Sequence, residues 1–265
     1  MIDTSLNTVH FLAIDIGNTR IKWGLFDANG AILKNGFCLN TNLTTLALPD
    51  ATHVLISNVA GNDIKSQLEI HLMRYANINW LKSTSKIAGV SNHYSKPETL
   101  GCDRWAALVA AWHIKQAPCV VVNAGTAVTI DALTINNNQA AFIGGLILPG
   151  LNLMQQSLGQ ATAQLPAANS AASAAPQSND SFPKNTVDAI YTGALQAIIG
   201  AITLMSHKLH AECKQLPYIL ISGGNAQTIK DNLMSNATQQ ALVVDHLVLR
   251  GLYLIDQFMQ SERAI

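Results

Sequence analysis

The sequence predicts an α/β protein built from two similar halves, residues 1–118 and 119–265. The first observation is a short apolar strand that leads into Asp15-Ile16-Gly17-Asn18-Thr19-Arg20-Ile21-Lys22 and then becomes apolar again. The second is Asn123-Ala124-Gly125-Thr126, which follows Val120-Val121-Val122 and precedes another alternating strand. Because both segments have the order strand, small polar turn, strand, we interpret the chain as one supersecondary unit used twice.

Both turns have residues suited to phosphate. Gly17 lets the backbone approach a ligand, and the turn N–H groups, with Asn18 and Thr19, can point at anionic oxygens. Lys22 adds a positive charge, and Asp15 suits a hydrated Mg²⁺, which prefers one or two carboxylates plus substrate phosphates. Taken alone, the segment also fits an ordinary hairpin. Two such loops facing a cleft resemble the actin-like, sugar-kinase and Hsp70 ATPase superfamily, so we expect duplicated ribonuclease H-like domains with ATP between them.

In the first half, apolar periodicity predicts both strands and helices. Asn29-Gly30 is a strong hairpin signal between two of the strands. Trp105, Leu108 and Val109 lie at helical spacing after an irregular segment broken by Pro97. The predicted strands are 11–16, 20–27, 31–38, 52–58 and 79–81, and the predicted helices are 62–76 and one that begins at 102.

The second half opens with the hairpin at Asn123 and continues with alternating strands and helices. The predicted strands are 140–147, 218–221 and 242–244, and the predicted helices are 151–158, 186–213 and 247–259. Asn185 or Thr186 caps the long helix. Residues 159–184 are rich in Ala, Ser and Asn and are interpreted as a mobile loop, either a solvated one or a cover for the active site. Gly223-Gly224 is either a close approach to adenine or ribose or a simple strand-to-helix turn.

The composition limits the classes of partner. The chain has 265 residues, 49% hydrophobic and 12% charged, with a formal net charge of +0. Nucleic-acid-binding proteins usually carry a basic face, so nucleic acid is not expected as the main partner. Few charges also suggest an apolar surface covered by a second subunit. No apolar run approaches the length needed to cross a bilayer, the N-terminus lacks a basic signal region, and four scattered cysteines indicate reduced thiols, so we expect a cytoplasmic protein.

Four motifs follow one another along the chain: Asp15-x-Gly-Asn-Thr-x-x-Lys22, Gly101-x-Asp103-Arg104-Trp105, Gly125-Thr126-Ala127-x-Thr129-x-Asp131 and Gly144-Gly145-x-Ile147-x-Pro149-Gly150. In that order, over nearly the whole chain, they resemble the type III pantothenate kinases. The late segments Ser222-Gly-Gly-Asn-Ala and Asp245 to Leu252 also resemble that family. The resemblance implies transfer of the ATP γ-phosphate to the 4′-hydroxyl of pantothenate, the first step of coenzyme A synthesis, by a homodimer.

The resemblance also implies roles for individual residues. The residues expected to hold the ATP phosphates and Mg²⁺ are Asp15, Ile16, Gly17, Asn18, Thr19, Arg20, Ile21 and Lys22, with Thr126 from the other half. Those expected to bind pantothenate are Tyr94, Gly101, Cys102, Asp103, Arg104 and Thr186, the last lent by the dimer partner. Asp103 is expected to accept the hydroxyl proton, and the Arg104 guanidinium suits the pantothenate carboxylate because it offers two parallel hydrogen bonds.

Three positions leave alternatives open. Asp103 and Thr186 each stand where a helix N-cap is expected, so capping alone explains either residue. Asn123 departs from the family, which usually has an aspartate there that helps to bind an activating monovalent cation, K⁺ or NH₄⁺. Asparagine keeps an oxygen ligand but loses the charge, so we expect weaker cation binding or a compensating ligand. Asn225 likewise stands where an aspartate is common in the adenosine turn.

Three functions are therefore compared. The leading hypothesis is pantothenate kinase. The alternative is a non-catalytic relative that binds nucleotide as an accessory or regulatory protein, which only Asn123 favours and which intact Asp15, Asp103 and Arg104 oppose. The third is a different small-molecule kinase or phosphatase on the same fold, against which Tyr94 and the Gly101 motif argue by resemblance alone.

Overall fold

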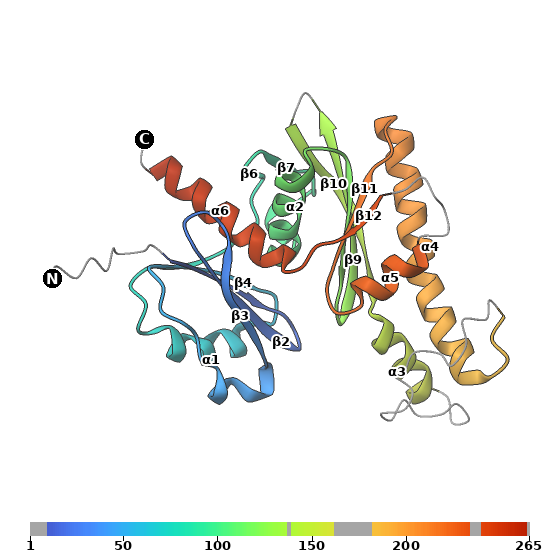
Figure 1. Ribbon diagram of the computed structural model, residues 1–265, viewed down its shortest axis with the longest axis horizontal. Coiled ribbons are helices and arrows are strands. Elements are labelled where there is room, and N and C mark those ends of the chain that lie inside the picture. The colour runs from blue at the N-terminus through green and yellow to red at the C-terminus, as the bar shows by residue number, and fades with distance from the viewer. Residues whose placement is uncertain (1–9, 137–138, 162–181, 234–239, 264–265) are drawn as a thin grey trace. The chain divides into compact units, whose positions relative to one another are not determined.

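The chain folds into two units, each built on a mixed β-sheet with helices packed against it (Figure 1). This computed structural model describes residues 10–136, 139–161, 182–233 and 240–263. The first unit comprises Met1–Gln116, Asn138–Phe142 and His246–Ile265, and the second comprises Ala117–Asn137 and Ile143–Asp245. The division expected after residue 118 thus lies within two residues of a unit boundary, but two later segments return to the first unit.

The first unit has a five-stranded sheet in the spatial order β3, β2, β1, β4, β5. The strands are β1 (Phe11–Ile16), β2 (Arg20–Phe26), β3 (Ile32–Leu39), β4 (His53–Asn58) and β5 (Ile78–Trp80). β1 pairs antiparallel with β2 and parallel with β4, and all six of its residues are buried. A side chain near the end of β1 is therefore flanked by strands on both sides.

Helical segments and two small strands complete the first unit. Its helical segments are η1 (Asn40–Thr45), α1 (Asn62–Leu72), η2 (Pro97–Thr99), α2 (Cys102–Lys115) and α6 (Leu247–Arg263). The small strands β6 (Lys86–Ile87) and β7 (Val90–Asn92) pair with each other, and β7 also pairs with the first residues of β10 (Gln139–Pro149).

The two faces of the first sheet are packed against different helices. Leu12, Ile14 and Ile16 of β1 form one apolar cluster with residues of α1 and η1. The opposite face meets α2 and α6, where the Tyr253 ring stacks on Phe26 with centroids 5.1 Å apart.

The helices α6 and α2 cross at a glycine. A Cβ on Gly251 of α6 would overlap the carbonyl of Ala106 in α2. This close crossing docks the C-terminal helix on the first unit, away from the half to which its sequence position assigned it.

The second unit repeats the strand order of the first. It contains β8 (Cys119–Ala124), β9 (Ala127–Asn136), β11 (Tyr218–Ser222) and β12 (Ala241–Val243), in the order β12, β11, β8, β9, β10. β8 pairs antiparallel with β9 and parallel with β11, as β1 does with β2 and β4. The duplication predicted from the two polar turns is therefore confirmed.

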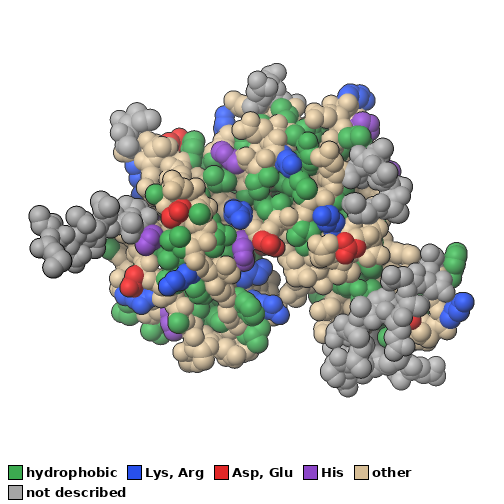
Figure 2. Space-filling model, viewed as in Figure 1, with side chains coloured by type: hydrophobic (Ala, Val, Ile, Leu, Met, Phe, Trp, Pro, Cys, Tyr) green, Lys and Arg blue, Asp and Glu red, His purple; other side chains and the backbone are tan. Residues whose placement is uncertain are grey.

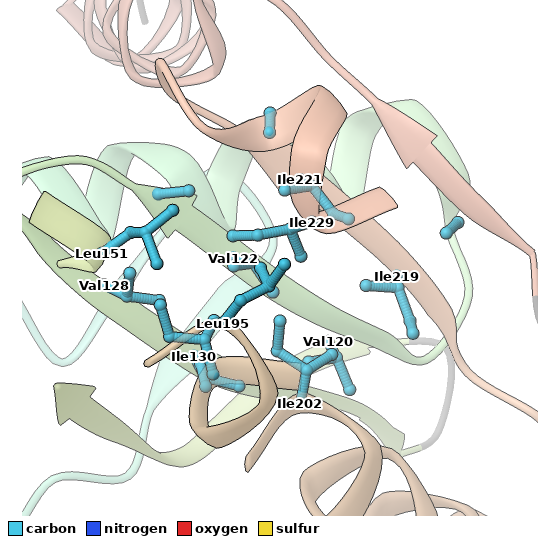
Figure 3. Packing of buried hydrophobic residues seen from close by; sticks show 14 of the residues in the cluster. Val120, Val122, Val128, Ile130, Leu151, Leu195, Ile202, Ile219, Ile221 and Ile229 are labelled. Atoms are coloured by element: carbon cyan, nitrogen blue, oxygen red, sulfur yellow. The ribbon is translucent and has the colours of Figure 1, made fainter. Parts of the chain in front are cut away.

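Helices α3 (Leu151–Ala161), α4 (Thr186–Cys213) and α5 (Ala226–Leu233) belong to the second unit. Figure 3 shows Val120 and Val122 of β8 packed with Leu195 and Ile202 of α4 and Ile229 of α5. Because alternate residues of a strand share a face, Val120 and Val122 build this core, and Val121 and Asn123 lie on the other face.

The expectation that no apolar segment is long enough to cross a bilayer is wrong for one helix. By length and composition alone, α4 is long and apolar enough to cross a bilayer, with a mean hydropathy of 1.5 over its most apolar 18 residues. No other helix among the described residues passes this test. α4 nevertheless contributes Leu195, Ile198 and Ile202 to the core of the second unit, which explains one apolar stripe of the helix without a membrane.

Most predicted elements differ from the observed ones by one or two residues at their ends. α1 is shorter than predicted, because Tyr75 turns into the core and its hydroxyl donates to the carbonyl of Pro49 at 2.6 Å. α3 and α6 are longer than predicted. Most of the predicted loop over 159–184 lies outside the described residues.

Candidate active site

Asp15 is the penultimate residue of β1, beside Lys22 of β2 and Ser57 of β4. It shares a sheet face with Phe11, the face against which α2 and α6 pack, because strand residues alternate between faces. The side chain is 6% exposed, and its Oδ1 atom is buried with no hydrogen-bond partner among the described residues. An ionisable oxygen in this state fits a cation ligand.

The electrostatics link Asp15 to two other predicted site residues. Burial raises the pKa of Asp15 from 3.8 to about 6. The negative charge of Asp103 adds to this rise, whereas the charge of Lys22 and a hydrogen bond from Ser57 oppose it. Burial also raises the pKa of Asp103, against the hydrogen bond and charge of Arg104. The structure therefore brings two carboxylates and a lysine into one electrostatic site.

The phosphate-type turn between β1 and β2 is held from one side by Asn40. The Gly17 N–H donates to the Arg20 carbonyl at 3.0 Å, which closes the turn. The Asn40 amide Nδ2 donates to the Gly17 carbonyl at 2.8 Å, and the Asn40 backbone N–H donates to Thr19 at 3.1 Å. Asn18, Thr19 and Arg20 are exposed. Three carbonyls of the turn thus accept hydrogen bonds within the unit, while its polar side chains are exposed to solvent.

The start of α2 carries Asp103 as its second residue. Gly101 is the N-cap residue and makes no side-chain cap, so Asp103 is not the cap that the alternative explanation assumed. The Asp103 Oδ1 accepts a hydrogen bond from the Arg104 N–H at 2.7 Å. A Cβ on Gly101 would lie 2.7 Å from the same oxygen, so glycine leaves the space that the Asp103 carboxylate occupies.

Cys102 ties the start of α2 to the end of β4. Its Sγ accepts a hydrogen bond from the Asn58 N–H at 3.2 Å and lies 3.4 Å from the Ser57 hydroxyl oxygen. Ser57 also bonds to the carboxylate of Asp15. An ionised carboxylate only accepts hydrogen bonds, so the Ser57 hydroxyl donates to Asp15. Burial raises the pKa of the Cys102 thiol, which therefore stays neutral and acts as a structural link.

Arg104 is held against two aromatic rings. Its Nη1 donates to the Tyr94 hydroxyl at 3.0 Å, and its guanidinium carbon lies 5.7 Å from the Tyr94 ring centroid and 5.8 Å from that of Phe142. The side chain is only 5% exposed. Tyr94 and Arg104, predicted together as substrate residues, are in direct contact.

The second unit contains the remaining predicted residues. Asn123 lies between Thr129 of β9 and Ser222 of β11, the positions that correspond to Lys22 and Ser57 in the first unit. The row Thr129, Asn123 and Ser222 carries no charge, whereas the matching row in the first unit contains the charged side chains of Lys22 and Asp15. Among the described residues, no group of three or more His, Cys, Asp or Glu is arranged to hold a metal ion.

Thr126 lies in the turn between β8 and β9, which is held by close backbone contacts. Gly150 donates its N–H to the Thr126 carbonyl at 2.8 Å, and a Cβ on Gly150 would overlap that carbonyl. A Cβ on Gly223 would overlap Ala124. Gly223 thus lies in a strand-to-helix turn that packs on the second phosphate-type turn, and its approach to adenine or ribose stays a prediction.

Thr186 is the first residue of α4 and is exposed. The cap is Asn185, whose side-chain oxygen accepts from the Asp188 N–H at 2.8 Å and whose amide donates to the Asp188 carboxylate. Capping therefore does not explain Thr186.

Three residues of the site carry no sequence signal of their own: Ser57, Asn40 and Phe142. Ser57 and Phe142 are fully buried, and each lies in a strand that reads only as apolar. Their roles follow from register across strands that are distant in sequence. The pairing of Asp15 with Ser57 and that of Phe142 with Asn92 are examples, and a single sequence does not supply them.

The two duplicated sheets define a fold of the actin-like ATPase class. Component A of (R)-2-hydroxyglutaryl-CoA dehydratase from Acidaminococcus fermentans has a similar fold, with a TM-score of 0.53 at 11% identity over 97% of this chain and 100% of that one. A non-polymerisable ParM mutant is also similar, with a TM-score of 0.51 at 11% identity over 95% and 99%. These likenesses establish the fold alone.

The family follows from the sequence relatives. The model of the type III pantothenate kinases matches residues 11–208. The enzyme of that name from Nitrosospira multiformis is 39% identical over 92% of this chain and 90% of its own, and that from Nitrosomonas eutropha is 38% identical over 92% and 93%. The chain belongs to the type III pantothenate kinases. The leading functional hypothesis is therefore confirmed, and the non-catalytic alternative is not supported.

Proposed function

We propose that the first unit carries out the phosphoryl transfer to pantothenate, with Asp103 as the proton acceptor. The observation that carries this is the mutual electrostatic influence of Asp15, Lys22 and Asp103 at one end of the sheet. The 4′-hydroxyl oxygen attacks the γ-phosphorus of ATP, the bond to the β-phosphate oxygen breaks, and ADP leaves. The hydroxyl proton passes to Asp103, whose raised pKa makes it a better acceptor than an exposed aspartate.

We propose that ATP is held by the turn that joins β1 and β2, with Mg²⁺ on Asp15. The buried Oδ1 of Asp15, without a partner among the described residues, fits a cation ligand. When bound, Mg²⁺ supplies positive charge to the phosphate oxygens. Lys22 adds a second positive charge, and the residues proposed to surround the phosphates are Asp15, Ile16, Gly17, Asn18, Thr19, Arg20, Ile21 and Lys22, together with Thr126.

Pantothenate is proposed to lie against the start of α2. Arg104 pairs with its carboxylate, since the guanidinium plane is already oriented by Tyr94. Gly101 and Cys102 shape the backbone around Asp103. Thr186, exposed and not needed as a cap, is proposed to contact the substrate of the other subunit.

The proposed monovalent-cation site has Asn123 as a ligand. Asn123, Thr129 and Ser222 form a row of neutral oxygen-bearing side chains across three strands. Such oxygens fit a weakly held ion of low charge, such as K⁺ or NH₄⁺. Without the family's carboxylate, the ion is expected to bind more weakly.

The proposed assembly is a homodimer. Large apolar side chains of the second unit remain exposed on β10, α3 and α4, among them Ile147, Leu153 and Leu204. Only 33% of the most apolar window of α4 is buried within the chain. A second copy that covers this surface would remove it from water.

We propose a cytoplasmic enzyme that does not use nucleic acid or membrane as a partner. Figure 2 supports this in part, because positive and negative side chains are interspersed on the visible face. The net charge of +0 also argues against nucleic acid as a partner.

The experiment that tests the proposal is ADP release on adding pantothenate to the protein with Mg·ATP, with K⁺, NH₄⁺ or neither. Asp103→Asn should lower kcat about 10²- to 10⁴-fold, because the attacking hydroxyl loses its proton acceptor. Asp63→Asn is the matched control, since Asp63 is likewise the second residue of a helix but is exposed.

An unchanged kcat in Asp103→Asn, with wild-type turnover, would remove Asp103 from the reaction. Absence of turnover in the wild-type protein under every cation, despite ATP binding, would instead support a regulatory relative and would make Asn123→Asp the next variant to measure.

A further inference from the structure

Phe142 lies at the substrate end of the first unit although the chain reaches it through the second. It belongs to the first residues of β10 and is fully buried. It pairs with Asn92 of β7, and its carbonyl accepts a hydrogen bond from the His93 N–H at 3.0 Å. The backbone around Phe142 is therefore held firmly beside Tyr94.

The Phe142 ring forms one wall of the environment of Arg104. The Phe142 and Tyr94 ring centroids are 5.0 Å apart, and the Arg104 guanidinium carbon lies 5.8 Å and 5.7 Å from them. Asn92 braces the other side, since its side-chain oxygen accepts from the Tyr94 N–H at 3.1 Å. A guanidinium near two ring faces is attracted by both, and the Tyr94 hydroxyl fixes one of its nitrogens.

This arrangement restricts the plane of the guanidinium before any substrate arrives. A planar fork binds a carboxylate with two parallel hydrogen bonds only in a narrow range of orientations. A group held in its binding orientation loses less entropy when the ligand binds. A neutral alcohol in place of the carboxylate offers no such pair of charge-assisted bonds and gains little from the orientation.

We propose that Phe142 is a positioning residue that sets the preference of this kinase for an acidic substrate over its neutral analogue. The proposal rests on the role of Arg104 in binding the pantothenate carboxylate. Phe142 touches Arg104 and Tyr94, and its effect on the substrate passes through them.

The test measures kcat/KM for pantothenate and for pantothenol, in which a primary alcohol replaces the carboxylate. Phe142→Leu keeps an apolar side chain but removes the ring. The ratio of the two kcat/KM values should fall roughly tenfold, through a higher KM for pantothenate, with kcat and the pantothenol KM nearly unchanged. Phe142→Tyr keeps the ring and should restore most of the ratio.

Phe26→Leu is the matched control, because Phe26 is also fully buried in the first unit but packs on Phe11 and Tyr253. It should lose stability without changing the ratio. If Phe142→Leu does not fold, Phe142→Met provides the same comparison with a flexible side chain of similar size.

The Arg104→Gln variant separates the role of Phe142 from the role of Arg104 in binding the carboxylate. A ratio that falls in Arg104→Gln but is unchanged in folded Phe142→Leu or Phe142→Met overturns the role of Phe142 alone. A ratio unchanged in Arg104→Gln overturns the carboxylate role of Arg104 and this inference with it. Equal losses for both substrates in Phe142→Leu identify a merely structural residue and also overturn it.

Discussion

At the scale of single residues, Asp15 has an unfavourable position that suits its proposed role. The carboxylate lies in a strand buried on both faces, next to Asp103, and one of its oxygens has no partner among the described residues. Its pKa is about 6 instead of 3.8. A bound cation would offset this cost, so the same geometry that destabilises the free protein favours the loaded one.

The pH dependence of stability follows from the raised pKa. Between pH 3.8 and about 6 the unfolded chain gives up the Asp15 proton while the folded chain keeps it, so stability falls as pH rises through this window. Above it, the buried charge costs about 3 kcal/mol. Asp15→Asn should therefore raise the free energy of unfolding at pH 7.5, without Mg²⁺ or nucleotide, by about 1–3 kcal/mol, as measured by urea denaturation.

The gain in Asp15→Asn should disappear at about pH 3, below the unfolded pKa of 3.8, where both states of the wild-type chain hold the proton. Asp63→Asn is the control and should change stability little at either pH, since Asp63 is exposed. A variant that is less stable than the wild type at pH 7.5 would contradict the cost assigned to the Asp15 charge.

The absence of a carboxylate at position 123 should weaken binding of the monovalent cation. Asn123→Asp should lower the K⁺ activation constant on the order of fivefold or more, because a unit charge a few ångströms from the ion contributes about 1 kcal/mol even in water. The measurement is ADP release across a K⁺ series. Asn225→Asp makes the same change elsewhere in the second unit and should leave the K⁺ constant as it is. An activation constant unchanged by Asn123→Asp would mean that other ligands hold the ion.

At the scale of elements, the first turn of α4 divides two roles between neighbouring residues. Asn185 makes the cap through reciprocal hydrogen bonds with Asp188. Asn185→Ala should therefore lower the free energy of unfolding by about 1 kcal/mol. Thr186→Val should leave stability almost unchanged and raise the pantothenate KM about three- to tenfold, the effect of one lost hydrogen bond.

Thermal unfolding and steady-state kinetics on the same samples separate these roles. The two variants serve as controls for each other, because they change adjacent positions in one helix turn. A Thr186→Val protein with a normal KM but a lowered melting temperature would return Thr186 to a structural role.

At the scale of the whole molecule, the chain completes its first unit only at its end. α6 packs on α2 through Gly251 and on the sheet through Tyr253. The electrostatic site of Asp15 and Asp103 therefore lies in a unit that contains both β1 and α6. The exposed apolar side chains on β10, α3 and α4 belong to the other unit, where a second copy is proposed to bind.

The proposed exchange of Thr186 between subunits has a measurable consequence. In a dimer of one Asp103→Asn chain and one Thr186→Val chain, one site contains both changes and the other contains neither. At a pantothenate concentration well below KM, where each variant alone is slow, co-expression in equal amounts should therefore add about a quarter of the wild-type activity per chain from the intact sites. The mixture should sediment at twice the chain mass of 28.4 kDa. Activity equal to the average of the two separate variants would show that Thr186 acts within its own chain or not at all.

Local patterns in the sequence were sufficient for most of the elements and for the duplication, but not for β6, β7 or α5. Apolar runs predicted β1, β2 and β4 within one or two residues, and the two polar turns predicted two similar strand–turn–strand units. The length of α4 was also predictable, since a cap and a long apolar period mark its ends. The ordered motifs then indicated the family, and with it the reaction.

The tertiary structure decided what depends on distant neighbours. No local pattern shows that α6 joins the first unit, that Gly101 and not Asp103 is the N-cap residue of α2, or that Phe142 lies against Arg104. The raised pKa of Asp15 is of the same kind, because desolvation and the field of Asp103 come from other elements. A sequence determines backbone preference and the face on which a side chain lies, whereas burial and Coulomb coupling arise only when elements far apart in the chain pack together.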